Sequence, residues 1–403
     1  MKEAVDTATD GLHNSDDGAS AVVDITRHVS TKIQMMLVAR AAGRCQFRGC
    51  NEFLFEHPLT REDGNFAEKA HIVAFRERGP RGRDGDRPAD SNSIANLMLL
   101  CGRDHKLVDD NPEKYIRSEL ERHKAEHELR MRRLTALTSD MRSTVLQIKA
   151  RIGDNVVDIS EQEIWQALYP RYPSERLPHL LDLTGLGDEK AGAFYDLAAE
   201  RIHQEAARLY LPGSDLHTTK RLAVFGLAPM PLLVLLGSRL SNKVPVDFYQ
   251  CHRTRPDRWT WFESGEPVRF ATGQVRKGTT DAKAVLLLSL SGKLSIADVP
   301  ATIGDDVPVF EIALDGPRPD TGFLNRRDDL EEFRRAYRSL LTDLRGRHSG
   351  RVELHLLPAA PAPVAIACGY DLLPKVDPDL VVYDNIKPFG FIERLKVKNH
   401  ERY

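Results

Sequence analysis

The sequence predicts a protein of several domains that combines the α+β and α/β fold classes: a small domain held by a metal ion, a helical connector, and a larger α/β domain with two similar halves. Three observations support this assignment. The 403 residues are too many for one ordinary hydrophobic core. Cysteines and histidines gather between positions 45 and 105. From about residue 220, apolar strand-like segments alternate with helical ones, which is typical of a mostly parallel sheet.

The same observations give the expected boundaries. Residues 1–25 are polar and acidic and are expected to form a disordered tail. The small metal-bound domain is expected at 26–135, the helical connector and the start of the large domain at 136–215, and the duplicated domain at 216–403. Each boundary follows a change in composition along the chain.

Composition excludes several classes of protein. The net charge is −2, with 57 basic and 59 acidic residues, so the total charge indicates neither a nucleic-acid nor a membrane partner. The N-terminal stretch has no apolar core of signal-peptide length, and the longest apolar run, "PMPLLVLLG", is too short to span a bilayer. Five cysteines are too few for a disulfide framework, so we expect a cytoplasmic protein whose clustered cysteines bind metal.

The cysteine spacing in the small domain predicts a structural zinc site. A helix over 30–45 runs into Cys45, which forms a C-x4-C pair with Cys50, and Cys101 opens the stretch "CGRDH". Zinc takes four ligands, so the fourth must be Asp104 or His105. If a helix starts here, these two side chains point about 100° apart around its axis. We expect Asp104 on the zinc and His105 on a second, catalytic cation; the reverse assignment for His105 stays open.

The order of His71, Asn96 and His105, interleaved with the cysteines, resembles the HNH family of ββα-metal nucleases. The resemblance implies that His71 is the general base that activates water, that Asn96 orients it, and that His105 binds a divalent cation such as Mg²⁺. Two positions depart from the family pattern. Ala70 stands where Asp or His often precedes the base, and the fourth zinc position is Asp. Glu68 is a weak substitute for the missing carboxylate.

An arginine-rich loop, residues 76–87, lies between the expected base and the asparagine. A nuclease needs cations along the phosphate backbone of double-stranded DNA, and the candidates here are Arg76, Arg81 and Arg83. A flexible, solvated loop is the alternative reading of the same residues. A zinc module without catalysis is the alternative for the whole small domain.

Beyond the small domain, a long charged helix is expected over about 112–150, followed by short helices and proline-rich turns to 215. Strands are then expected, in the order "RLAVFGLA", "VPVDFYQ", "WTWFE", "KAVLLLSLS", "VPVFEIAL", "RVELHLLP" and "LVVYDN". The expected helices between them are "MPLLVLLGSRL", "DDLEEFRRAYRSLLTDLRGR" and "PVAIACGYDLL".

An internal repeat indicates that this domain is duplicated. The second copy lies 132 residues after the first and shares with it a strand, an Ala-Pro-x-Pro turn, a helix, a lysine and a second strand. The matched positions are Ala228, Pro229, Pro231, Gly237 and Lys243 in the first copy and Ala360, Pro361, Pro363, Gly369 and Lys375 in the second. Chance similarity between two strand–helix–strand units is the alternative.

Joined to the HNH-like segment, residues 155–395 resemble the SAVED domain, a fused pair of Rossmann-like units of the CARF type. Fusions of HNH and SAVED domains are effectors of bacterial anti-phage systems of the CBASS type. The resemblance implies a sensor for a cyclic oligonucleotide, such as a cyclic dinucleotide of the cyclic GMP-AMP type. It also implies a homo-oligomer that grows from a dimer when the ligand binds, and a nuclease that then degrades double-stranded DNA.

Several residues of this domain suit such a ligand. Each Ala-Pro-x-Pro turn leads into a helix N-terminus, whose N–H groups favour a phosphate. The aromatic candidates are expected on one face of a strand, where they can stack on a base, although core packing explains them equally well. The expected ligand-binding residues are Lys243, Gln250, Arg253, Trp259, Trp261, Pro361 and Lys375.

Three functions remain in competition at this point. The favoured hypothesis is a metal-dependent endonuclease activated by a cyclic dinucleotide. The second is a DNA-binding regulator that contains zinc and senses a nucleotide without cleaving DNA. The third is a constitutive nuclease of the restriction type. Dependence of cleavage on His71, on a divalent cation and on a small nucleotide separates them.

Overall fold

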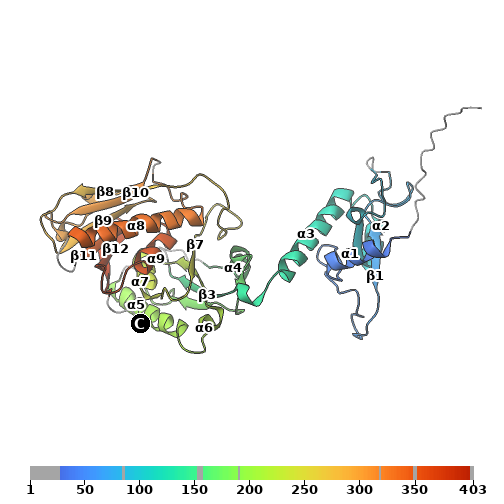
Figure 1. Ribbon diagram of the computed structural model, residues 1–403, viewed down its shortest axis with the longest axis horizontal. Helices are drawn as coiled ribbons and strands as arrows, with labels where there is room; N and C mark the ends of the chain where they lie inside the picture. The colour runs from blue at the N-terminus through green and yellow to red at the C-terminus, as the bar shows by residue number, and fades with distance from the viewer. Residues whose placement is uncertain are drawn as a thin grey trace, which may run out of the picture. The chain divides into compact units, whose positions relative to one another are not determined.

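The structure is a computed structural model that describes residues 28–83, 87–151, 158–188, 191–316, 319–347 and 352–399 (Figure 1). The expected disordered tail, residues 1–25, lies outside these ranges. The chain divides into two compact units, Met1–Ala136 and Leu137–Tyr403, here called the N-terminal and C-terminal units. The division falls one residue from the boundary that the sequence predicts.

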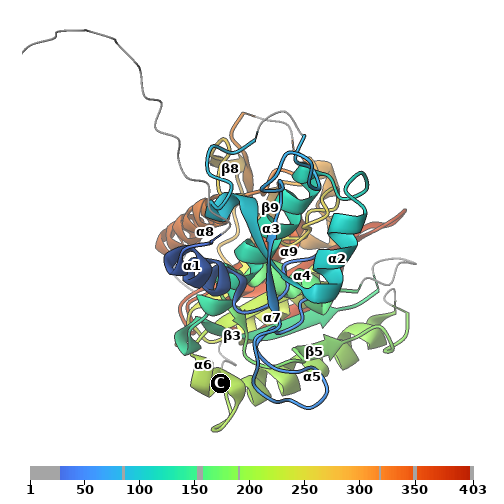
Figure 2. The same cartoon turned by 90° about the vertical axis from the view of Figure 1, so that its right-hand side faces the viewer.

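A two-stranded antiparallel sheet lies at the centre of the N-terminal unit. Strand β1 (Ala67–His71) pairs with β2 (Leu97–Cys101), and helices α1 (Thr31–Ala41) and α2 (Gly102–Asp110) lie on either side of the pair (Figure 2). The pairing sets His71 opposite Leu97, at the other end of the strands from Cys101. His71 and Cys101 therefore both belong to the sheet and lie at its opposite ends.

Local sequence explains these elements. The Ser30 side chain caps α1 by accepting a hydrogen bond from the Ile33 amide at 3.4 Å, and every residue of β2 is buried, as its apolar sequence predicts. Helix α3 (Arg117–Thr135) packs on α1 and buries part of one face. It ends at Thr135, so the prediction of one helix to residue 150 is wrong. Residues 142–149 form a strand instead, as their β-branched and apolar residues favour.

The C-terminal unit contains two sheets. The five-stranded sheet is wholly parallel and places β3 (Arg142–Lys149) beside β6 (Leu222–Leu227), followed by β7 (Val246–Tyr249). Two short strands, β4 (Tyr172–Pro173) and β5 (His179–Asp182), also pair with β3. Because β3 is a buried strand of this sheet, residues 136–215 are not a separate helical connector; they are the start of the large domain, the other part of that prediction, and the domain begins near residue 137.

The second sheet has six strands in the order β13-β12-β11-β9-β10-β8. Its four central strands are parallel and its two outer strands are antiparallel to their neighbours. The strands are β8 (Phe270–Arg276), β9 (Lys283–Ser289), β10 (Val309–Leu314), β11 (Glu353–Ala359), β12 (Asp379–Ile386) and β13 (Gly390–Val397). The prediction of a mostly parallel α/β domain is confirmed. The expected strand "WTWFE" is wrong, since these residues form a loop.

The duplication is visible in the centre of the unit. Helix α7 (Met230–Arg239) follows β6 and contacts β12 and β13 of the other sheet, whereas α9 (Ala362–Tyr370) follows β11 and contacts β6 and β7. The two helices therefore lie side by side between the sheets (Figure 1). The remaining helices are α4 (Glu161–Leu168), α5 (Gly192–Leu209), α6 (Asp215–Thr219) and α8 (Arg327–Arg347), and the short 3₁₀ turns are Ile94–Asn96, Ser139–Met141, Ile296–Asp298 and Ala301–Ile303.

Two equivalent glycines allow the helices to meet. A Cβ atom on Gly237 would lie 1.9 Å from the Ile366 carbonyl oxygen, and one on Gly369 would lie 1.9 Å from the Val234 carbonyl oxygen. Residues 234 and 237 stand 132 positions before 366 and 369, so the contact is reciprocal and obeys the repeat of the sequence. The two halves are thus related by a local two-fold axis at this crossing.

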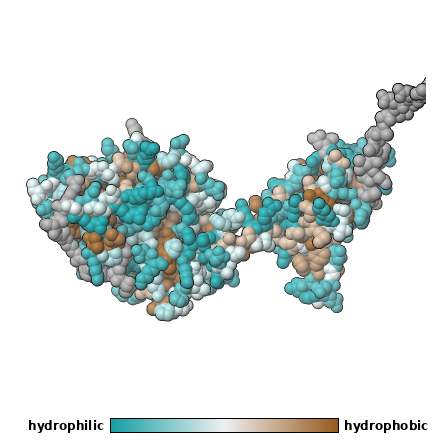
Figure 3. All heavy atoms as spheres, in the orientation of Figure 1, coloured by the Kyte–Doolittle hydropathy of each residue, from teal (hydrophilic) through white to brown (hydrophobic). Residues whose placement is uncertain are grey.

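Most of the large apolar side chains are buried. The face of the C-terminal unit seen in Figure 3 is mainly hydrophilic, with scattered apolar patches. Among the described residues, no helix combines the length and the apolar character that crossing a membrane requires.

Candidate functional site

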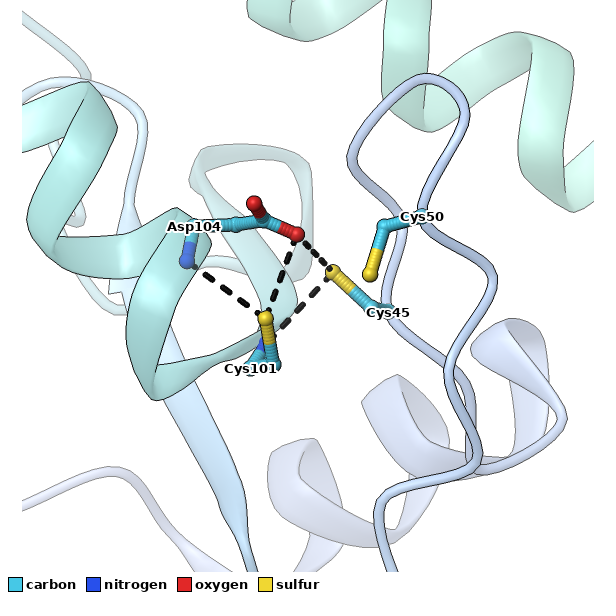
Figure 4. Close-up of side chains that lie close together, drawn as sticks. All are labelled: Cys45, Cys50, Cys101 and Asp104. Carbon is cyan, nitrogen blue, oxygen red and sulfur yellow. Dashed lines mark hydrogen bonds between the residues drawn. The ribbon is translucent and has the colours of Figure 1, made fainter. Parts of the chain in front are cut away.

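Three cysteines and one aspartate converge in the N-terminal unit. The thiols of Cys45, Cys50 and Cys101 and a carboxylate oxygen of Asp104 all lie within 4.8 Å of one another (Figure 4). The thiols of Cys45 and Cys101 each donate to Asp104 Oδ2 at 3.2 Å. The structure therefore brings Asp104, and not His105, next to the cysteines.

The local fold places these ligands. Cys101 ends β2 and caps α2, where its Sγ accepts a hydrogen bond from the Asp104 amide at 3.4 Å. Cys45 Sγ accepts from the Cys101 amide at the same distance, and the turn from Cys45 to Cys50 closes with a hydrogen bond from the Cys50 amide to the Phe47 carbonyl at 3.1 Å. A strand end, a helix start and a tight turn thus meet at one point.

Burial and the hydrogen bonds within the cluster set the pKa values of its side chains. Burial raises the pKa of the Cys45 thiol, and it raises that of Cys50 to about 11. Burial by itself would raise the pKa of Asp104 as well, but hydrogen bonds from the three thiols lower it. Tetrahedral zinc with Zn–S bonds of about 2.3 Å needs sulfurs about 3.8 Å apart and draws the protons from thiols. Three sulfurs and one oxygen at this spacing fit zinc.

His105 turns away from the cluster, toward β1 and its own helix. Its Nε2 lies 3.4 Å from an oxygen of Asp109, one helical turn later, and its Nδ1 lies 3.9 Å from an oxygen of Glu68. The contact with Asp109 raises the pKa of His105. Neighbouring residues 104 and 105 therefore serve separate groups of side chains, and an imidazole between two carboxylates can hold a divalent cation.

His71 and His105 line one cavity of about 460 Å³. The cavity lies where β1 ends and α2 passes beside it. Its lining also includes the basic side chains of Lys69, Arg76 and Arg78. The two histidines that the sequence assigns to base and cation thus share a space that a phosphate group can enter.

Two asparagines hold the segment around His71. Asn96 is buried; its amide nitrogen donates to the carbonyls of Val73 and Ser91, and its oxygen accepts from the Val73 amide, each at 2.9 Å. Asn92 Oδ1 lies 3.0 Å from His71 Nε2. Asn96 therefore fixes the backbone that follows His71, while Asn92 orients the ring itself.

The structure separates the three arginines that the sequence proposed for DNA. Arg76 lines the cavity and is exposed, and Arg83 is exposed. Arg81 is buried, with a left-handed backbone at φ 55°. Its guanidinium donates to the carbonyls of Ile72 and Val108 at 2.6 and 2.8 Å and pairs with Asp109 at 3.0 Å. Arg81 is therefore a structural residue, and its assignment to DNA is wrong.

In the C-terminal unit, the matched lysines and the helix N-termini lie at opposite ends of their strands. Pro361 begins α9 at the carboxyl end of β11. Lys375 follows the C-terminus of α9 and precedes β12, and Lys243 stands in the same place before β7. Both lysines are exposed. Within one half, a phosphate at the helix N-terminus is therefore out of reach of the matched lysine.

Comparison with known proteins identifies part of the chain. Residues 202–397 match the family model of the SMODS-associated and fused to various effectors sensor domain, SAVED. This stretch is a SAVED domain. It contains the glycine crossing and both helices that follow the Ala-Pro-x-Pro turns. No curated protein gave a significant match.

The solved structures that match this chain include two bacterial receptors. The Acinetobacter baumannii Cap4 SAVED/CARF-domain containing receptor with the cyclic trinucleotide 3′3′3′-cAAA is 13% identical, with a TM-score of 0.43, over 73% of this chain and 62% of that one. The Moraxella osloensis Cap4 receptor is 12% identical, with a TM-score of 0.40, over 73% and 60%. This chain thus spans less than two thirds of each receptor.

The aromatic candidates of the SAVED domain belong to its core. Trp259 is 1% exposed and its ring meets Phe225 edge-on, while Trp261 is 8% exposed. Neither is on a strand, so the prediction that both rings stand on one exposed face to stack on a base is wrong. Gln250 is also buried and donates to the Cys251 carbonyl at 3.0 Å, whereas Arg253 is exposed.

Sequence reasoning missed two residues that contact the histidines of the cavity. Asp109 stands four residues after His105 on one helix, a spacing that marks a side-chain pair and was a usable signal. Asn92 reaches His71 from the loop before the 3₁₀ turn, and no spacing rule indicates that contact. The complete set around the cavity is thus larger than the three residues that the family resemblance implies.

Proposed function

We propose that this chain is an endonuclease of the HNH type that a cyclic oligonucleotide activates, acting on double-stranded DNA in anti-phage defence. The observation that carries the proposal is the cavity that His71 and His105 share beside the cluster of three cysteines and Asp104. The SAVED domain supports the sensing role, because such domains are sensors fused to effectors. An effector and a sensor in one chain suit regulated cleavage.

His71 is proposed as the general base. With the proton on Nε2, the ring donates to Asn92 Oδ1 at 3.0 Å, which leaves Nδ1 to accept a proton from the attacking water. His105, with Asp109 and Glu68 close by, is proposed to hold a divalent cation such as Mg²⁺. Such a cation stabilises negative charge on the phosphate and on the leaving oxygen.

The cluster of Cys45, Cys50, Cys101 and Asp104 is proposed to hold zinc in a structural role. All four positions are filled by protein side chains, which is typical of structural sites, whereas catalytic zinc keeps a position for water. Zinc here fixes the end of β2 to the start of α2 and so sets the position of His105.

DNA is proposed to approach over the basic rim of the cavity. Arg76 and Arg78 line it and are exposed, and Arg83 is exposed on the same loop. Contacts to phosphates of this kind position the backbone and carry no base information. Cleavage with little sequence preference is the expected result.

The SAVED domain is proposed to bind a cyclic dinucleotide of the cyclic GMP-AMP type. The N-termini of α7 and α9 supply backbone N–H groups at the carboxyl ends of β6 and β11, where ligands bind in parallel sheets. Ligand binding is proposed to drive assembly of dimers into tetramers or larger particles, which supplies part of the roughly 5.5 kcal/mol needed to switch a population from 1:99 to 99:1. Light scattering should then show a larger particle with ligand than without.

The test is a plasmid cleavage assay with Mg²⁺ and a panel of cyclic di- and trinucleotides. We expect cleavage with one of these ligands, none without Mg²⁺, and a loss of at least about a hundredfold in His71→Ala. The matched control is His57→Asn, since His57 does not line the cavity; it accepts two turn amides and its ring packs against Phe66. Cleavage by His71→Ala at the wild-type rate would refute the nuclease, and cleavage without any ligand would refute the gating.

A further inference from the structure

Six buried polar atoms without a hydrogen-bond partner lie in one short stretch, Gln250–Trp261, here called the donor loop. Among the residues that the structure describes, no other stretch of this length gathers as many. They are Gln250 Oε1, His252 Nε2, Arg255 Nη1, Arg258 Nε, Trp259 Nε1 and Trp261 Nε1. Buried polar groups are nearly always paired, so such a concentration asks for an explanation.

The chemistry of these atoms points to an anion. Five of the six are nitrogens that donate hydrogen bonds, with His252 doing so in one tautomer. The loop also carries Arg253 and has Asp257 as its one acidic residue. A set of donors with excess positive charge is complementary to phosphate oxygens, which are strong acceptors without hydrogens to donate.

The position of the donor loop suits a ligand. The loop begins directly after β7, at the carboxyl end of a strand in a parallel sheet, where ligands of α/β folds bind. It has neither helix nor strand, and side chains hold it together. The Arg255 guanidinium lies 4.0 Å from the centre of the Phe262 ring, and the His252 ring lies 6.1 Å from that of Trp261.

Only the first half of the SAVED domain has this feature. In the second half, β12 ends at Ile386 and turns directly into β13, which begins at Gly390. The two halves therefore differ in the segment that follows the second matched strand, which is β7 in the first half and β12 in the second. A ligand bound across both halves meets the donor loop on one side alone.

We propose that the donor loop binds a phosphate of the cyclic oligonucleotide, and that the loop rearranges to do so. The rearrangement is required because the unpaired nitrogens are covered by neighbouring side chains rather than open to solvent. This inference rests on the proposed sensing function and assigns a phosphate contact to the first half only. It also gives the buried tryptophans a role that differs from base stacking: they donate through Nε1.

The test measures affinity and stability separately. Trp261→Phe removes the N–H and keeps an aromatic ring, and Trp165→Phe is the matched control, because Trp165 is not part of the donor loop, is exposed and stacks on Tyr172. Each full-length protein is titrated by calorimetry, without DNA, against cyclic GMP-AMP and cyclic tri-AMP, and its Tm is recorded without ligand. Arg255→Met provides a second variant of the loop.

We expect Trp261→Phe and Arg255→Met to bind about tenfold more weakly, the size of one charge-assisted hydrogen bond. The Tm of Trp261→Phe should fall by only the small amount that the lost ring volume costs, because the ligand-free protein loses no hydrogen bond at Nε1. Equal affinity in both variants overturns the inference. If the wild type binds neither probe, the proposed sensing function itself fails.

Discussion

The N-terminal and C-terminal units of this chain differ in what holds them together. The C-terminal unit has a large apolar core shared by both sheets, with α7 and α9 at its centre. The N-terminal unit has a much smaller core and adds polar ties: the cysteine cluster, Asn96 and Arg81. Small domains bury too little apolar surface to be secure without such ties. In the small unit, polar side chains therefore serve the fold as well as the chemistry.

Removing the proposed zinc ion should have the largest effect on stability, and this effect should be confined to the N-terminal unit. We expect a chelator, or Cys101→Ser, to unfold the N-terminal unit, because the free energy of binding structural zinc, about 10 kcal/mol or more, is folding free energy in small domains. All three tryptophans, Trp165, Trp259 and Trp261, belong to the C-terminal unit, so their fluorescence reports on that unit alone. Circular dichroism should fall while tryptophan fluorescence stays constant.

The matched control is Cys251→Ser, which changes a thiol of the C-terminal unit. It should keep the zinc content and the helical signal of the wild type. A Cys101→Ser protein with full zinc content and an unchanged spectrum would show that the cluster is not a zinc site.

The glycine crossing should be the most sensitive point of the C-terminal unit. Gly237→Ala places a Cβ against a backbone carbonyl that cannot move without displacing α9, so we expect a loss of about 3 kcal/mol or more in the free energy of unfolding. Gly369→Ala should cost a similar amount, because the contact is reciprocal. Urea unfolding followed by tryptophan fluorescence measures both.

Gly346→Ala is the control for helix propensity. Gly346 lies in α8 with open space around it, so alanine there should stabilise the unit by up to about 1 kcal/mol. If Gly237→Ala changes stability no more than Gly346→Ala does, the helices do not pack as closely as described.

The sequence predicts the C-terminal unit better than the N-terminal one, and the reason is physical. The repeat, the Ala-Pro-x-Pro turns and α7 with α9 are local patterns, and the two glycines that form the crossing are among the matched positions. The charged helix predicted from the sequence extends over 142–149, although the β-branched and apolar residues there favour a strand. Whether Trp259 and Trp261 face solvent depends on the core around them. Their spacing at alternate positions predicts that they share one face of a strand, but not whether that face is exposed.

In the N-terminal unit, residue types are predicted more reliably than residue roles. The cysteines lie next to Asp104, as their spacing predicts, and the two histidines line one cavity, as the family resemblance implies. Arg81 and Arg83 are two residues apart in one basic loop, and nothing in that loop separates them. The partners of Arg81 are backbone carbonyls of Ile72 and Val108, which any residue could supply. Its role is therefore fixed by tertiary structure alone.

The smallest expected effect separates those two arginines. Arg81→Lys keeps the charge but loses the forked donors that reach two carbonyls and Asp109, so we expect the N-terminal unit to lose about 2 kcal/mol of stability. Arg83→Lys, on the exposed loop, should change stability by less than about 0.5 kcal/mol. Chemical denaturation followed by circular dichroism measures both.

For DNA affinity, the variant of Arg83 should have the larger effect and the variant of Arg81 the smaller one. Arg83→Gln should weaken plasmid binding and reduce its dependence on salt, because one phosphate contact is lost. Arg81→Lys should bind DNA like the wild type at a temperature where it stays folded, since its guanidinium never reaches the surface. If Arg81→Lys instead keeps full stability and loses DNA affinity, the guanidinium must leave its buried site to contact DNA, and the polar ties of the small unit would then be part of the binding step.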